Sequence, residues 1–212
     1  LPHADYTIAS GLVGAALEEA ALAWLLAGYT FDQYRKPADP IAGLVAPEGI
    51  DADRITIIAN GEALTRDLIN TPASDMGPDE LEDAIRSLSS EFDAVLNVTT
   101  GDDLIMSGFP MIHAVGRAST REPRLLDMRW GEAGPQLTLV GKGVCFDTGG
   151  LNIKPGNSMG LMKKDMGGSA TVLGLAQMIM ALELPLRLRV LIPAVENAID
   201  GNAFRQIGRA HV

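Results

Sequence analysis

The chain has 212 residues, of which 47% are hydrophobic and 21% are charged, with 17 basic and 27 acidic side chains and a formal charge of −10. This composition is typical of one globular domain, or one domain and part of another, and argues against disorder. The acidic balance and the absence of a long basic run argue against a nucleic acid partner, and no apolar stretch reaches the roughly 18–20 residues of a membrane span.

The amino-terminal part begins with a predicted helix over 11–28, where alanine and leucine recur at helical spacing and Gly28 follows as a C-cap. Residues 29–34 alternate aromatic side chains, a pattern typical of a strand. A linker is predicted at 36–40, which contains two prolines, and a domain boundary is predicted between 40 and 51.

Helices and short strands then alternate. One helix is expected from Asp51 to Asn70, and another begins at Pro78 with two carboxylates in its first turn. Further helices are predicted at 102–107 and 169–182, and strands at 94–98, 111–115, 124–128, 137–140 and 186–192. This alternation predicts an α/β domain with a largely parallel or mixed sheet covered on both faces.

The two ends of the sequence differ from those of a complete gene product. The first residue is Leu1 rather than methionine. Residues 207–212 have no apolar periodicity and equal one reading-frame translation of a widely used sequencing-library adapter. We interpret 206–212 as an artefact and exclude them from the fold prediction; a genuine terminal tail is the alternative.

The stretch from 141 to 168 carries the chemistry, because a strand runs there into a glycine-rich loop with several charged residues. Asp147 and Asp165 are candidate oxygen ligands for divalent cations. Lys142 could bind a cation through a neutral amine, while a charged Lys154 could stabilise an oxyanion. Together these residues would begin a two-metal site that generates a hydroxide nucleophile and polarises a carbonyl group.

Other interpretations of these residues stay open. The two aspartates could make turn hydrogen bonds, and the lysines could form surface ion pairs. A phosphate-binding loop would require the Gly-x-x-x-x-Gly-Lys-Ser/Thr spacing, which this sequence lacks. The Asp-Thr-Gly sequence at 147–149 matches the aspartic protease signature, but the chain has no second copy to share a proton. Cys145 is the only cysteine and cannot form an internal disulfide, which fits a reducing compartment.

The block 142–150, with Lys154-Pro155, Met162-Lys163 and Asp165-Met166, resembles the first signature of the leucyl aminopeptidases, the cytosol aminopeptidase or M17 family. Three more segments are similar to that family: Tyr29–Tyr34 to the end of its amino-terminal domain, Arg66–Pro72 to its Arg-Asp-Leu-x-Asn-x-Pro segment, and Val195–Arg205 to its Glu-Asn and Gly-Asn-Ala motifs. The resemblance covers nearly everything from Gly28 to Arg205.

This resemblance implies a role for each residue of the block. Lys142 and Asp165 would ligate the more tightly held metal, and Asp147 would bridge both metals. Lys154 would be the catalytic lysine that polarises the scissile carbonyl, and Met162 would line the pocket for the amino-terminal side chain of the substrate. The metals would be two divalent ions, Mn²⁺ or Zn²⁺, and one of them would also hold the free α-amino group.

The resemblance also implies an α/β/α sandwich with a central mixed, mostly parallel sheet, preceded by the end of a smaller amino-terminal domain. On this basis 1–45 are the remnant of that domain and its linker, and 46–205 are a partial catalytic domain. The implied reaction is release of amino-terminal residues, often leucine, from peptide substrates by a cytoplasmic homo-hexamer.

The chain departs from the family in one respect that bears on activity. The family's second block, Asn-Thr-Asp-Ala-Glu-Gly-Arg, supplies two more carboxylate ligands and an arginine associated with bicarbonate, and it does not occur here. We therefore expect the parent protein to be an aminopeptidase and this fragment alone to be inactive and to bind metal weakly. Two alternatives are a non-catalytic scaffold or DNA-architectural member of the same fold and a hydrolase that uses the Asp-Thr-Gly aspartate.

Overall fold

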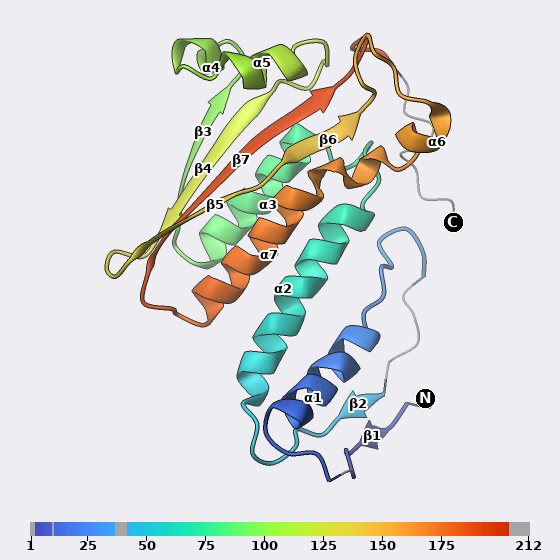
Figure 1. The fold of residues 1–212 in the computed structure, drawn as a ribbon, viewed down its shortest axis with the longest axis vertical. Helices are drawn as coiled ribbons and strands as arrows, with labels where there is room; N and C mark the ends of the chain where they lie inside the picture. The colour runs from blue at the N-terminus through green and yellow to red at the C-terminus, as the bar shows by residue number, and fades with distance from the viewer. Residues whose placement is uncertain (1–2, 10, 37–41, 204–212) are drawn as a thin grey trace.

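The structure is a computed structural model that describes residues 3–9, 11–36 and 42–203. Its centre is a five-stranded sheet in which β3, β4 and β7 lie side by side, and β5 and β6 both pair with β7 (Figure 1). The strands are β3 (Val95–Thr100), β4 (Arg124–Trp130), β5 (Gln136–Val140), β6 (Gly143–Asp147) and β7 (Arg187–Asn197).

The sheet is mixed. Strand β4 is antiparallel to both β3 and β7, whereas β5 and β6 are parallel to β7. Four of the five strands of this described sheet therefore run in the same direction, and β4 alone opposes them. The predicted α/β class with a mixed, mostly parallel sheet is confirmed. Strand β5 pairs with the first part of β7 and β6 pairs with its last part. The end of β6 therefore lies beside the end of β7.

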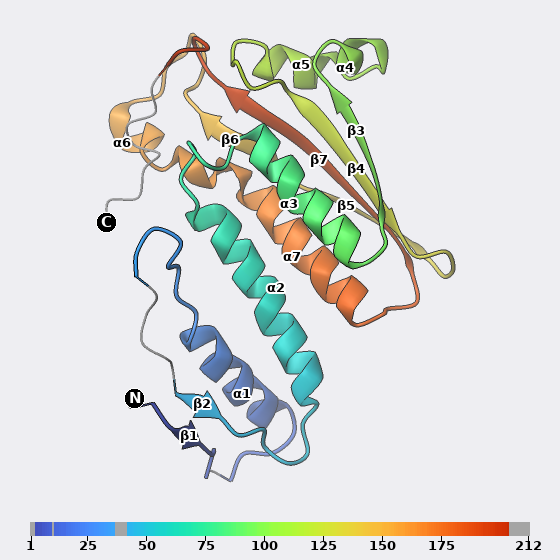
Figure 2. The same cartoon turned by 180° about the vertical axis from the view of Figure 1, so that it is seen from behind.

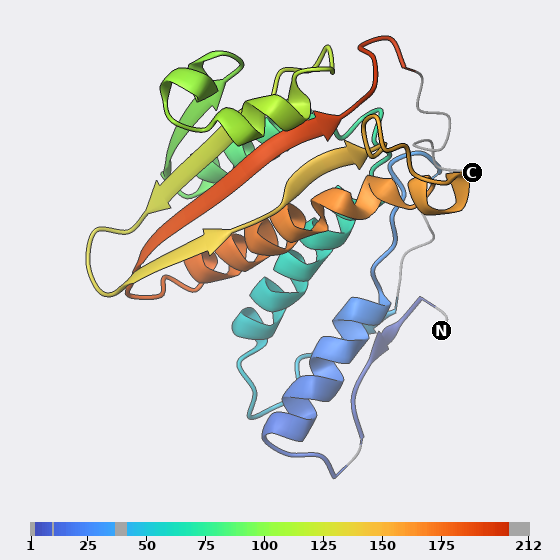
Figure 3. The same cartoon turned by 45° about the horizontal axis from the view of Figure 1, so that its top comes forward.

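Helices α3 (Pro78–Glu91) and α7 (Gly167–Ala181) lie on one face of the sheet (Figure 2). Helix α2 (Ala52–Asn70) packs against α7, and α1 (Ala15–Ala27) packs against α2. The short helices α4 (Asp103–Met106) and α5 (Pro110–Gly116) lie on the opposite side at one end of the sheet (Figure 3). The four longer helices occur where the sequence predicted them.

The core lies between the sheet and the α3–α7 layer. Along β7, alternate side chains are buried toward the helices, namely Leu188, Val190, Ile192 and Ala194. They pack in one cluster with apolar residues of α3 and α7, including Leu81, Ile85, Leu173 and Met180. This alternation fixes the register of β7, because a shift by one residue would turn these side chains out of the core.

The segment 29–34 is not a strand, contrary to the prediction from its aromatic alternation. It runs past α2 as a loop, and its tyrosines are held by polar contacts instead of a sheet. The hydroxyl of Tyr29 donates to Asp67 over 2.6 Å, and that of Tyr34 donates to Asp75 over 2.6 Å. Burial and the hydrogen bond to a carboxylate raise the pKa of both tyrosines to about 12.

The other amino-terminal elements are two short parallel strands, β1 (Asp5–Tyr6) and β2 (Gly43–Leu44). The linker predicted at 36–40 falls almost entirely on residues outside the described ranges. The artefact predicted at 206–212 lies outside them as well. Among the described residues, no helix combines the length and the apolar character needed to cross a membrane.

Two further segments differ from the prediction. Residues 111–115 belong to helix α5 rather than to a strand, because Pro110 occupies the first turn and its fixed φ favours a helix start. Residues 143–147 form strand β6, where a glycine-rich loop was expected. The backbone of β6 finds its partner in the end of β7, which continues to Asn197 instead of ending near residue 192.

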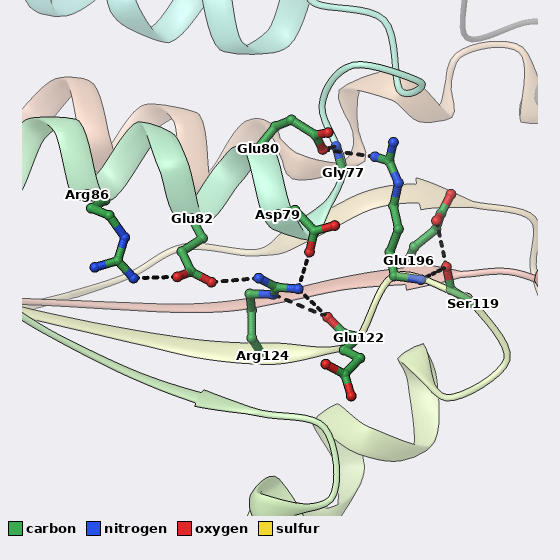
Figure 4. Close-up of polar contacts among 10 residues, drawn as sticks. Gly77, Asp79, Glu80, Glu82, Arg86, Ser119, Glu122, Arg124 and Glu196 are labelled. Carbon is green, nitrogen blue, oxygen red and sulfur yellow. Dashed lines mark hydrogen bonds and ion pairs between the residues drawn. The ribbon is translucent and has the colours of Figure 1, made fainter.

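Helix α3 is joined to β4 by a network of charged side chains (Figure 4). The guanidinium of Arg124, whose side chain is only 11% exposed, donates to Glu82 over 2.6 Å and also pairs with Asp79. Glu82 accepts a second hydrogen bond from Arg86. Burial alone would raise the pKa of Glu82, but the hydrogen bonds from both arginines outweigh it and lower the pKa.

We expect Arg124→Ala to reduce the free energy of unfolding of the intact protein by about 2–3 kcal/mol at pH 7, because two carboxylates lose a largely buried charged donor. The pKa of Glu82 is lower in the folded state, so its contribution is present above the unfolded pKa and is lost as pH falls through the folded pKa. The effect of the substitution should therefore shrink toward pH 3. Urea unfolding at both pH values measures it.

The matched control for this substitution is Arg86→Ala. Arg86 binds the same carboxylate, but its side chain is 55% exposed, so its loss should cost less than about 1 kcal/mol. Equal destabilisation by the two variants would show that the burial of Arg124 is not what gives this network its strength.

Candidate metal centre

The position of strand β6 determines where the candidate residues of the glycine-rich stretch lie. Lys142 precedes the strand and Asp147 is its last residue. The 3₁₀ helix η1 (Met162–Met166) packs against β6 and contains Asp165. The backbone NH of Ser169 donates to the carbonyl of Lys142 over 2.9 Å, which ties the first turn of α7 to the start of β6.

The first pair in this region joins Lys142 to Asp165. The ammonium of Lys142 lies 2.9 Å from Oδ1 of Asp165, and the two side chains are 58% and 17% exposed. The second carboxylate oxygen, Oδ2 of Asp165, is buried and has no hydrogen-bond partner among the described residues. A buried carboxylate oxygen without a donor is costly, and a bound cation would satisfy it.

The second pair joins Lys154 to Asp147. The ammonium of Lys154 lies 3.0 Å from Oδ2 of Asp147. The other oxygen, Oδ1, accepts hydrogen bonds from the backbone NH of Gly149 over 2.9 Å and from Nδ2 of Asn197 over 2.7 Å. Burial alone would raise the pKa of Asp147, but the hydrogen bonds from Lys154, Gly149 and Asn197 outweigh it and lower the pKa. Asp147 is therefore held as a carboxylate.

Lys154 reaches Asp147 because the loop after β6 folds back on itself. The backbone NH of Lys154 donates to the carbonyl of Thr148 over 2.9 Å. Within this turn Gly149 has φ +87°, and a Cβ there would lie 2.3 Å from the carbonyl oxygen of Asn152. Any larger residue at 149 would strain the turn, so this glycine is a requirement of the site geometry.

Helix η1 also contains Met162, which is half-buried, and Lys163. The ammonium of Lys163 donates over 2.9 Å to the carbonyl of Asn70, the last residue of α2. Burial lowers the pKa of Lys163. This contact anchors η1 to the end of α2, and through η1 it supports Asp165.

The structure thus places the four charged residues in two lysine–carboxylate pairs. Lys142 directly precedes strand β6 and Asp147 ends it, Lys154 lies in the loop after β6, and Asp165 lies on helix η1. Within the described ranges, no group of three or more His, Cys, Asp or Glu side chains could hold a metal ion. The metal and catalytic roles of these residues remain predictions. Sequence reasoning gave no role to Asn197 or Lys163, although both lie inside the motifs that carry the family resemblance.

The sequence profile of the cytosol aminopeptidase family, catalytic domain, matches residues 63–207, which is more than half of the chain. The chain belongs to the cytosol aminopeptidase family. The family match argues against the aspartic protease alternative for Asp147. It includes all the residues of the two ion pairs and the whole of the mixed sheet.

Similar proteins agree with this family. A probable cytosol aminopeptidase of Chlamydia abortus is 38% identical over 191 residues, which are 84% of this chain and 38% of the relative. The crystal structure of the cytosol aminopeptidase from Coxiella burnetii is 48% identical, with a TM-score of 0.88 over 97% of this chain and 45% of that one. The bottromycin maturation enzyme BotP in complex with Mn is 35% identical, with a TM-score of 0.81 over 93% of this chain and 44% of that one.

The chain spans about two fifths of the length of the curated relatives it matches. It therefore aligns with only part of each relative, although nearly all of its own length finds a counterpart in the Coxiella structure.

Proposed function

We propose that this chain is part of a metal-dependent aminopeptidase that releases amino-terminal, leucine-like residues from peptides. The observation that carries the proposal is the arrangement of Asp147 and Asp165 at strand β6 and helix η1, each beside a lysine, in a member of the cytosol aminopeptidase family. Carboxylates in such a protected position are suited to hold divalent cations.

Two carboxylate oxygens among the described residues support the proposal of a metal at this site. Oδ2 of Asp165 is buried without a partner, and Oδ2 of Asp147 has only the ammonium of Lys154 beside it. Asp165, Asp147 and Lys142 would hold the ions, Mn²⁺ or Zn²⁺, and the manganese complex of the related BotP supports this choice of metal. When bound, such ions activate water and polarise a carbonyl group.

The chain's own residues would supply the remaining steps. Lys154 would place its ammonium near the substrate carbonyl, where it would stabilise the charge that develops on oxygen. Met162, which is half-buried on η1, would contact the amino-terminal side chain of the substrate. Lys154, which is paired here with Oδ2 of Asp147, would turn its ammonium from that oxygen toward the substrate when the site is loaded.

The substrates, the oligomeric state, the cellular location and the bicarbonate are proposals as well. We expect peptides as substrates, a homo-hexamer in the intact protein, a cytoplasmic location and a bicarbonate near the second ligand block of the family. The relatives named as cytosol aminopeptidases support the location. The 212-residue chain by itself should bind metal weakly and be inactive, because two carboxylates and one amine are fewer ligands than two cations require.

The test is release of p-nitroaniline from leucyl-p-nitroanilide by the intact protein supplied with Mn²⁺ or Zn²⁺. We expect release that a chelator abolishes and added metal restores. A substrate with an acetylated amino terminus is the control, since an aminopeptidase requires a free amino group and should leave it intact. No release from the free substrate, or release that is insensitive to the chelator, would contradict the proposal.

A further inference from the structure

Asn197 is the last residue of β7 and stands directly beside Asp147, the last residue of β6, in the parallel pairing of the two strands. The pairing has a bulge between Val144 and Phe146, and beyond it Phe146 is matched with Glu196 and Asp147 with Asn197. The bulge therefore sets which residue of β7 lies next to the carboxylate.

Asn197 makes two kinds of contact with the end of β6. Its backbone carbonyl accepts hydrogen bonds from the NH of Thr148 over 3.0 Å and from the hydroxyl of Thr148 over 2.8 Å. Its side-chain amide donates to Oδ1 of Asp147 over 2.7 Å. The backbone contacts hold the two strands together whatever the side chain is. The side-chain amide can therefore bind the carboxylate of Asp147 without being needed for the strand pairing.

The side-chain amide of Asn197 helps to fix the orientation of the Asp147 carboxylate. Oδ1 receives two donors, the amide of Asn197 and the NH of Gly149, which occupy its two lone pairs. Oδ2 is left to face Lys154. Rotation of the carboxylate would break both hydrogen bonds to Oδ1, so the side chain is locked with one oxygen turned toward the backbone and the other toward the site.

We propose that Asn197 is a positioning residue that fixes Asp147 with Oδ2 as its metal-binding oxygen. This inference rests on the proposed function, in which Asp147 binds the metal. Partners that orient a metal ligand in this way typically change metal affinity or activity by about 10–100-fold when they are removed. Asn197 therefore controls metal affinity without touching the metal.

The experiment measures Mn²⁺ affinity of the metal-depleted intact protein by titration calorimetry. We expect Asn197→Ala to weaken Mn²⁺ binding by about 10–100-fold, while the thermal unfolding of the metal-free protein stays close to that of the wild type. Asn197→Leu keeps the side-chain volume but not the donor, and it should weaken binding to the same extent even if alanine loosens the strand end. Asn97→Ala, an exposed asparagine on β3 of the same sheet, should bind Mn²⁺ as the wild type does.

Asp147→Ala is measured in parallel, so that the two proposals can fail separately. If Asp147→Ala loses Mn²⁺ affinity and both Asn197 variants keep it, the positioning role is wrong and the metal site stands. If Asp147→Ala itself binds Mn²⁺ as the wild type does, Asp147 is not a ligand, and both the metal assignment and the inference are overturned.

Discussion

Lys154→Ala should lower kcat of the intact protein toward leucyl-p-nitroanilide by about 10²–10³-fold, the typical cost of removing one group that stabilises an oxyanion. KM and Mn²⁺ affinity should change little, because Asp147 keeps its hydrogen bonds from Gly149 and Asn197 when the lysine is gone. The side chain of Lys154 is 31% exposed, so its loss should leave the fold intact.

The matched control is Lys164→Ala, which removes an exposed lysine from the same segment. Steady-state kinetics at saturating Mn²⁺ separate kcat from KM for both variants. Wild-type kcat in Lys154→Ala would remove the role assigned to this lysine, and an equal loss in Lys164→Ala would point to the general charge of the segment instead.

Asp165→Ala should abolish most of the stabilisation that Mn²⁺ gives to the intact protein. At free Mn²⁺ of about 100 times Kd, a ligand stabilises the folded state by about 2.7 kcal/mol. Removal of a direct ligand should raise Kd by about 100-fold or more, since even loss of an orienting partner can reach that figure. The stabilisation of the folded state by Mn²⁺ then falls to about 0.4 kcal/mol.

The measurement is chemical unfolding of the intact protein with and without Mn²⁺. Asp83→Ala, which removes an exposed carboxylate on α3, should keep the full gain. The same gain in Asp165→Ala would mean that the buried, unpartnered oxygen of Asp165 does not face a cation.

Most of the fold could be predicted because its longer elements carry strong local signals. Helix α2 ends at Asn70 before Thr71-Pro72, and α3 begins at Pro78, as the sequence indicated. The segment 111–115 was mispredicted because five mostly apolar residues fit a helix and a strand equally well, and the start at Pro110 decided between them. Strand β6 was missed because its glycines indicate a loop, whereas pairing with β7 is a tertiary effect.

In the candidate site too, the features with local signals could be predicted and those set by tertiary structure could not. Lys142, Asp147, Lys154 and Asp165 could be named from the residues and the family resemblance, because their types and spacing are local. Which lysine pairs with which carboxylate depends on the fold of the loop after β6 and on the packing of η1, and neither is local. Asn197 could not be assigned, because its role arises only from the register of β7 against β6.

The most direct test of the metal site is an anomalous difference map from crystals of the intact protein grown with Mn²⁺. We expect peaks that contact Oδ2 of Asp147 and the carboxylate of Asp165, with the amine of Lys142 turned from its ion pair toward a metal. Manganese bound elsewhere, with the Lys142–Asp165 and Lys154–Asp147 pairs unchanged, would contradict this expectation.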